Sequence, residues 1–210
     1  MSALNARLGL LLACLLSCSG TPDAKQQARK PSSDAPTGGI SQGQMCAEDT
    51  TISISRDSIW RLPWRATIQA LRSKCPSSHD TLVLAEENAS PGIRFLFRGL
   101  RATAVQYRKH LHYAEPPDMW IVVGTSATLP KDLPFEASWT QLHAAYGDAI
   151  IGTEDEDGLT VKFCQLPDFF FALDSSLPPQ GLIRDLTKVP AAAKVRQLWI
   201  MVEPRAGWTC

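Results

Sequence analysis

The sequence lacks several features that would point directly to a function. No hydrophobic run is long enough to cross a bilayer as a helix in the mature protein. The chain has no net charge, with 21 basic and 21 acidic residues, and this balance gives no reason to expect nucleic acid as a partner. It contains no Gly-x-Ser-x-Gly elbow, no Ser-x-x-Lys and no glycine-rich phosphate loop. We therefore assign no catalytic residue, no metal ligand and no cofactor, although a nucleophile and its base can meet from distant positions.

The N-terminal segment has the layout of an export signal. Residues 1–7 carry one positive charge, residues 8–16 form a short apolar run, and small residues follow. The run Leu15-Leu16-Ser17-Cys18 resembles the lipobox of bacterial lipoproteins, in which the cysteine is acylated after cleavage before it. This resemblance implies a signal peptide over residues 1–17 and lipidation, with palmitate among the acyl chains, at Cys18. The alternatives are a second box ending at Cys14 and an ordinary export signal with a leftover cysteine.

The residues after Cys18 indicate a tether and a destination. Ser19, in place of an aspartate, resembles lipoproteins sent to the outer membrane, so we expect an anchor there that faces the periplasm. The inner membrane and the cell surface are alternatives. Residues 19–44 are rich in Ser, Gly, Pro, Gln and Lys and poor in apolar residues, a composition that cannot offset its ordering entropy. We predict a lipidated cysteine and disordered linker over residues 18–44, followed by a globular domain over residues 45–210.

Cysteine use agrees with export. Four cysteines lie in the expected domain: Cys46, Cys75, Cys164 and Cys210. An even number in an exported domain suggests two disulfides, for which three connectivities exist. We predict Cys46–Cys75 and Cys164–Cys210, because each pair would crosslink one half of the domain. A metal site is the alternative, but it needs closely spaced ligands, and these four cysteines are far apart in the sequence.

Two segments of the domain resemble each other. Residues 62–71 align with residues 133–142 through a shared Leu-Pro pair, an aromatic residue, an alanine and a final leucine. Apolar residues at helical spacing then predict two short helices with one apolar stripe each, Ile68, Leu71 and Cys75 in the first and Trp139, Leu142 and Tyr146 in the second. Trp64 and Trp139 are expected in the core, whereas Trp60, Trp120 and Trp208 could instead be exposed anchors.

Strand patterns follow each of the two predicted helices. Period-two alternation or a short apolar run marks residues 81–85, 92–97, 102–107, 120–123, 149–153, 158–163, 169–173 and 195–202. We therefore expect an α+β fold of two tandem repeats, each a helix followed by antiparallel strands, over residues 52–113 and 119–203.

A helix followed by a strand meander, twice over, resembles the β-lactamase-inhibitor-protein type and the SmpA/OmlA lipoproteins of outer-membrane assembly. The residues that carry the resemblance are those at 62–71 and 133–142, with the glycine-led strands at Gly92 and Gly158. These families usually have a glycine-rich turn into the helix, where this chain has Leu-Pro-aromatic. The resemblance therefore implies an architecture, and no binding residue is carried across.

The charge distribution suggests a binding surface. Residues 45–114 hold 10 basic and 6 acidic residues, whereas residues 115–210 hold 7 and 13. The basic residues gather in and after the strands of the first half, at Arg94, Arg98, Arg101, Arg108 and Lys109. A basic face of this kind would attract an acidic partner. The alternative is that the two halves complement each other or that the charges only solvate the surface.

Two histidines were also considered as metal ligands. His110 and His112 would lie on one face if residues 107–113 continued a strand, a spacing able to hold a metal ion. No third ligand lies nearby in the sequence, so a solvated strand end is the alternative.

Taken together, the sequence predicts a lipid-anchored, non-catalytic binding or scaffold module that recognises an envelope protein or polymer. An envelope hydrolase or metal-dependent enzyme and a proteinaceous inhibitor of a secreted enzyme are the alternatives.

Overall fold

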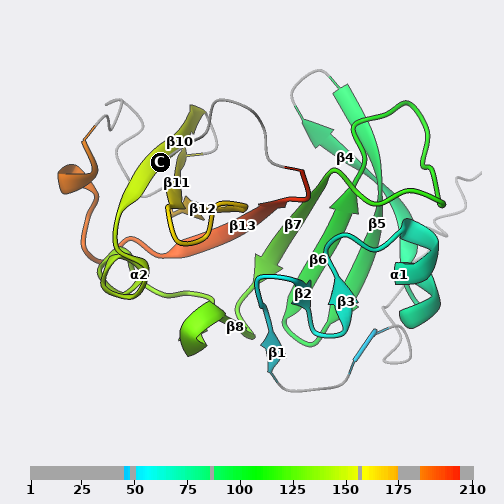
Figure 1. Cartoon of the computed structure of the whole chain (residues 1–210), viewed down its shortest axis with the longest axis horizontal. Helices are drawn as coiled ribbons and strands as arrows, with labels where there is room; N and C mark the ends of the chain where they lie inside the picture. Colours follow the sequence, from blue (N-terminus) through cyan, green and yellow to red (C-terminus); the bar gives the residue numbers. More distant parts are fainter. Residues whose placement is uncertain (1–44, 48–50, 86–87, 156–157, 175–184, 204–210) are drawn as a thin grey trace, which may run out of the picture. The chain divides into compact units, whose positions relative to one another are not determined.

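An eight-stranded antiparallel sheet forms most of the structure (Figure 1). The computed structural model describes residues 45–47, 51–85, 88–155, 158–174 and 185–203, all within the unit Ile40–Cys210. The expected signal peptide, Cys18, the linker, Trp208 and Cys210 lie outside these residues. In the sheet the strands lie in the order β10 (Ala149–Asp155), β11 (Gly158–Phe163), β12 (Phe169–Leu173), β13 (Val195–Met201), β7 (Met119–Gly124), β6 (Leu100–Val105), β5 (Asn88–Phe97) and β4 (His79–Ala85).

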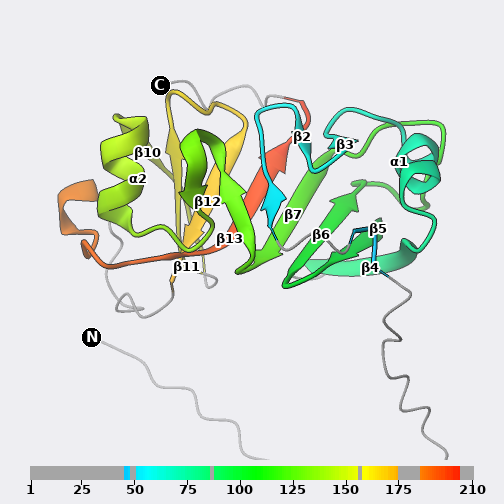
Figure 2. The same cartoon turned by 90° about the horizontal axis from the view of Figure 1, so that it is seen from below.

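Short elements surround this sheet. A three-stranded sheet contains β1 (Ile52–Ser53), β8 (Ala127–Leu129) and β9 (Leu133–Pro134), and a two-stranded hairpin contains β2 (Ser58–Ile59) and β3 (Leu62–Pro63). The helices are α1 (Ile68–Lys74), α2 (Trp139–Tyr146) and two 3₁₀ turns, η2 (Pro130–Asp132) and η3 (Leu186–Lys188). Figures 1 and 2 show α1, α2 and the β2–β3 hairpin on the same face of the large sheet. Among the described residues, no helix combines the length and apolar character needed to cross a membrane.

Local sequence sets the limits of both α-helices. The side chain of Thr67 accepts a hydrogen bond from the backbone N–H of Ala70 and caps the start of α1. Ser138 caps α2 in the same way, and the Gln141 side chain accepts in return from the Ser138 backbone N–H at 2.9 Å. Pro76 follows the C-terminal cap of α1, and Gly147 ends α2 with a φ of +72°.

The predicted α+β fold of two tandem helix-and-strand repeats is wrong. Strands dominate the structure, and the two α-helices contain only seven and eight residues. The strands of both halves join one continuous sheet, because β7 pairs with β13 from Met119↔Met201 to Val123↔Gln197. Apolar periodicity predicts which side chains face the core, but it does not predict which strand edges pair, and this pairing decides the fold class.

An aromatic core fills the space between the sheet and the elements on its covered face. Trp64 packs edge-on against Trp120, with ring centroids 5.2 Å apart, and Trp120 stacks on Phe95 at 5.4 Å. On the side of α2, Trp139 stacks on Phe163 at 5.8 Å. Trp64 and Trp139 are buried, which confirms their predicted place in the core, and Trp120 is a core residue as well.

Candidate functional site

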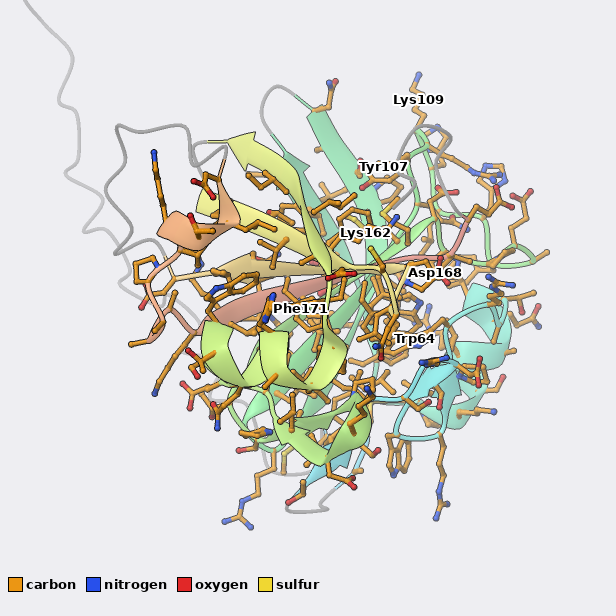
Figure 3. The ribbon with its side chains drawn as sticks, turned by 60° about the vertical axis from the view of Figure 1, so that its left-hand side comes forward. Trp64, Tyr107, Lys109, Lys162, Asp168 and Phe171 are labelled. Carbon is orange, nitrogen blue, oxygen red and sulfur yellow. A yellow bond between two sulfur atoms is a disulfide. The ribbon has the colours of Figure 1, made fainter. Side chains whose placement is uncertain are left out.

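The large sheet has a second face, opposite the helices. Antiparallel strands in register place paired residues on the same side of a sheet. One such row crosses all eight strands: His79, Arg94, Thr103, Ile121, Trp199, Phe170, Lys162 and Ile150. The neighbouring residue Phe171 points the other way and stacks on Tyr146 of α2, and Figure 3 shows it on the side of that helix. We call the face that carries this row the open face, since α1 and α2 lie on the other side (Figure 2), although Thr103 and Lys162 within the row are buried.

Three of the five basic residues that were predicted to form a binding surface lie at the β5–β6 hairpin. Arg94 pairs with Thr103 and Leu96 pairs with Arg101, so both arginines belong to the open face. Arg98 lies in the turn beside Gly99, whose φ of +69° suits a glycine. Arg98 and Arg101 are exposed, and Arg94 is partly exposed. None of these hairpin arginines forms an ion pair within the described residues.

The other two basic residues lie elsewhere. Arg108 and Lys109 belong to the loop of residues 106–118, at the opposite end of β6 from the hairpin turn. Arg108 forms an ion pair with Glu115 of the same loop, and Lys109 is exposed (Figure 3). The five residues therefore do not form one basic cluster, and the binding prediction narrows to the hairpin arginines.

Two donors on the open face lack an acceptor. The Nε of Arg94 and the indole Nε1 of Trp199 are buried atoms without a hydrogen-bond partner in the described protein. Buried donors are usually satisfied, because leaving one unpaired costs about 1–3 kcal/mol. The two residues lie three strands apart in the same row, about 14 Å between their Cα atoms at ordinary strand spacing. Sequence reasoning missed Trp199, because an apolar strand pattern does not reveal an unsatisfied indole N–H.

A buried glutamine organises the loop that carries Arg108 and Lys109. Gln106 is fully buried, and its side-chain N–H₂ donates to the carbonyl of Pro116 at 2.9 Å. The same side chain forms hydrogen bonds with the backbone of His112. No sequence pattern predicted this role for Gln106.

His110 and His112, the two candidate metal ligands, lie in that loop and not on a strand. His112 Nδ1 lies 3.7 Å from Glu115 Oε1, and His110 is exposed. Within the described ranges, no group of three His, Cys, Asp or Glu side chains could hold a metal ion. The strand geometry that motivated a paired-histidine site is therefore absent from residues 106–118.

The cysteines crosslink the chain outside the open face. Cys46 and Cys75 form a disulfide with Cα atoms 5.0 Å apart, which ties the first described segment to the end of α1. The Cys46 N–H also donates to the Leu96 carbonyl at 2.7 Å. Cys164 is disulfide-bonded as well. Its predicted partner, Cys210, lies outside the described residues, so this second pairing stays a prediction.

One edge of the large sheet carries exposed apolar side chains. Strand β4 forms one edge of the large sheet. Its Leu82 and Leu84 side chains are 65% and 81% exposed, the highest values among the large apolar residues described. An edge strand offers unpaired backbone groups to another strand, and exposed leucines add an apolar contact.

Comparison with known proteins gives a structural likeness and no match in sequence. No protein-family model matches the sequence, and no curated protein does. The crystal structure of the uncharacterized protein yfeY from Escherichia coli is similar, with a TM-score of 0.50 and 11% sequence identity. The likeness covers 72% of this chain and 99% of that chain. At this identity it shows a shared fold alone.

Proposed function

We propose that the protein is a lipid-anchored, non-catalytic binding module of the bacterial envelope, held at the periplasmic side of the outer membrane through Cys18. It binds an acidic envelope protein or polymer through the open face, at the hairpin arginines Arg94, Arg98 and Arg101. The lipobox-like Leu15-Leu16-Ser17-Cys18 supports the anchor. Two or more acyl chains are needed for a stable membrane anchor, and acylation of the new amino terminus would supply them.

The hairpin arginines carry the proposal for binding. They lie together and are not neutralised by ion pairs with described residues, and the Nε of Arg94 is a buried donor without an acceptor. Guanidinium groups bind carboxylate and phosphate oxygens with charge-assisted hydrogen bonds, and a concentrated positive field raises the rate of encounter with an acidic partner. An acidic partner that covers the exposed Arg98 and Arg101 would gain from both effects at once.

Metabolic labelling with radioactive palmitate tests the anchor. We expect the label on the parent protein, no label on Cys18→Ser, and full label on Cys14→Ser. The Cys14 variant is the matched control because Cys14 ends the second candidate box. Label that persists on Cys18→Ser, or that never enters the parent protein, would overturn the proposed anchor.

Site-specific crosslinking in cells tests the binding face. A photo-reactive residue replaces Val123, which pairs with Arg101 across β6 and β7, and in a control Ala144, which is exposed on α2. We expect a captured partner at Val123 that is lost when Arg98→Glu and Arg101→Glu are combined. The matched control, Lys188→Glu with Lys194→Glu, changes the net charge equally at exposed lysines elsewhere. Equal capture by both double variants would overturn the role of the hairpin arginines.

A further inference from the structure

A cavity of about 310 Å³ lies where the β2–β3 hairpin meets the end of β13 and the turn before β12. Its apolar wall contains Trp64, Ile200 and Val202, whose side chains are only 1–4% exposed, so a small part of each faces the cavity. Trp64 and Asp168, which both line the cavity, lie close together in Figure 3. This volume is at the lower end of the range for small-molecule sites, which run from about 300 to 1,000 Å³.

The apolar wall is held in place by its contacts. The indole N–H of Trp64 donates to the carbonyl of Ser55 at 3.1 Å. Its ring packs edge-on against Trp120 and against Phe169, with centroids 5.2 and 6.5 Å away. The wall therefore needs little rearrangement before a ligand contacts it, which lowers the ordering cost of binding.

Four charged side chains surround the cavity: Arg56, Asp57, Arg65 and Asp168. Two of these side chains are basic and two are acidic. They nevertheless form no ion pair with one another or with any other described residue. Their side chains also make no hydrogen bond in the described part of the chain. Both charge signs are therefore available to a ligand at the same site.

Backbone hydrogen bonds fix the two aspartates. The Trp64 N–H donates to the Asp57 carbonyl at 2.9 Å, and the Met201 N–H donates to the Asp168 carbonyl at 2.9 Å. The two carboxylates thus come from different segments of the chain, one from the residue before β2 and one from the turn before β12.

We propose that this cavity binds a small zwitterion with an apolar side chain, namely a hydrophobic amino acid or a short peptide. The ligand's carboxylate pairs with Arg56 or Arg65, its ammonium pairs with Asp57 or Asp168, and its apolar side chain packs on Trp64. Charge-assisted hydrogen bonds to the charged rim orient the two ends and supply most of the affinity, and contact of the apolar part with the small exposed area of the apolar wall adds to it. This site lies on different residues from the open face and does not depend on the proposed envelope partner.

Isothermal titration of the full lipoprotein in detergent micelles tests the proposal. The probes are L-phenylalanine, the dipeptide leucyl-phenylalanine and the neutral N-acetyl-phenylalaninamide. We expect saturable binding of the dipeptide or of both zwitterions, and about tenfold weaker binding of the neutral compound, because it lacks both charges. Binding of the dipeptide alone would identify a short peptide as the ligand. No saturable binding of either zwitterion, or equal affinity for the neutral compound, would overturn the proposal.

Paired substitutions locate the binding. Arg56→Gln with Arg65→Gln removes both basic rim charges, Asp57→Asn with Asp168→Asn removes both acidic ones, and we expect each double variant to weaken zwitterion binding about tenfold. Arg61→Gln with Arg196→Gln and Asp132→Asn with Asp148→Asn are the matched controls, since all four residues are exposed and none lines the cavity. These controls should bind as the parent does. Unchanged affinity in both rim variants would contradict this site even if the zwitterions bind elsewhere.

Discussion

The side chain of Gln106 satisfies both backbone polar groups of His112. Its amide nitrogen donates to the His112 carbonyl at 3.1 Å, and its amide oxygen accepts from the His112 N–H at 2.7 Å. The fully buried Gln106 side chain thus supplies the loop of residues 106–118 with hydrogen bonds that a neighbouring strand would otherwise supply. This relationship explains how a long loop with many exposed polar residues keeps a defined path beside the sheet.

Replacing Gln106 with alanine should destabilise the protein by about 2–3 kcal/mol, because three part-buried backbone groups, two of His112 and one of Pro116, lose their hydrogen-bond partners at once. Urea unfolding measures the loss. Gln69→Ala is the control, since Gln69 is an exposed glutamine on α1, and it should change stability little. An equal effect of the two substitutions would contradict the structural role of Gln106.

The protein should lose stability in strong alkali partly through Tyr146. Burial raises the pKa of Tyr146 from 10.0 to about 12, and its hydroxyl donates to the Pro130 carbonyl. Because the folded-state pKa is the higher one, this contribution is complete below the unfolded pKa and is lost as the pH rises from about 10 to about 12. Tyr146→Phe should therefore flatten the fall in unfolding free energy over that range, as measured by urea unfolding at several pH values.

Tyr113 needs a separate control in that experiment. A hydrogen bond to the Asp80 carboxylate raises the pKa of Tyr113 as well, although this side chain is exposed. Tyr113→Phe should remove its own tyrosinate signal from the ultraviolet titration and leave the late-titrating Tyr146 in place. A tyrosinate signal complete near the ordinary tyrosine pKa in the parent protein would contradict the assignment to Tyr146.

Removing the first disulfide should destabilise the domain. Cys46 and Cys75 are 29 residues apart in the sequence, and a loop of that size contributes about 3.6 kcal/mol in the chain-entropy model. The double variant Cys46→Ala with Cys75→Ala should unfold at a lower urea concentration. Ser73→Ala, at the same end of α1, serves as the control. Unfolding of the double variant at the parent's midpoint would count against the crosslink.

The exposed leucines of β4 should promote self-association. Replacing Leu82 and Leu84 with threonine keeps strand propensity and removes the apolar contact. We expect the variant to remain monomeric at concentrations where the parent associates, as measured by sedimentation velocity, with stability within about 0.5 kcal/mol. Val83→Thr is the matched control, because Val83 lies between the leucines and points to the other side of the strand. Equal association of the parent and the double variant would exclude this edge as the contact.

Local elements could be predicted from the sequence more closely than their assembly. Residues 158–163 and 169–173 were expected as strands and coincide with β11 (Gly158–Phe163) and β12 (Phe169–Leu173). Apolar alternation is a local signal, so it is sufficient for such strands. The same signal does not distinguish one shared sheet from two tandem units, which is why the fold class was wrong.

The candidate site was predictable only in part. Arg94, Arg98 and Arg101 were expected to bind, and the structure gathers them at one hairpin because β5 and β6 pair in register. Arg108 and Lys109 are near them in the sequence but lie at the other end of β6. The indole of Trp199 could not be found this way, because its place in the same row as Arg94 depends on the pairing of β7 with β13.

The position of β13 also constrains how the polypeptide acquires its native form. β13 follows every other described strand in the sequence, yet it lies in the middle of the sheet between β12 and β7. A chain that emerges from a membrane channel amino end first would therefore form two separate sets of strands, β4–β7 and β10–β12. Each set would keep an unpaired strand edge until β13 arrives. Such an intermediate would be a natural substrate for a holding chaperone, and a premature stop codon before Val195 would leave the halves unjoined.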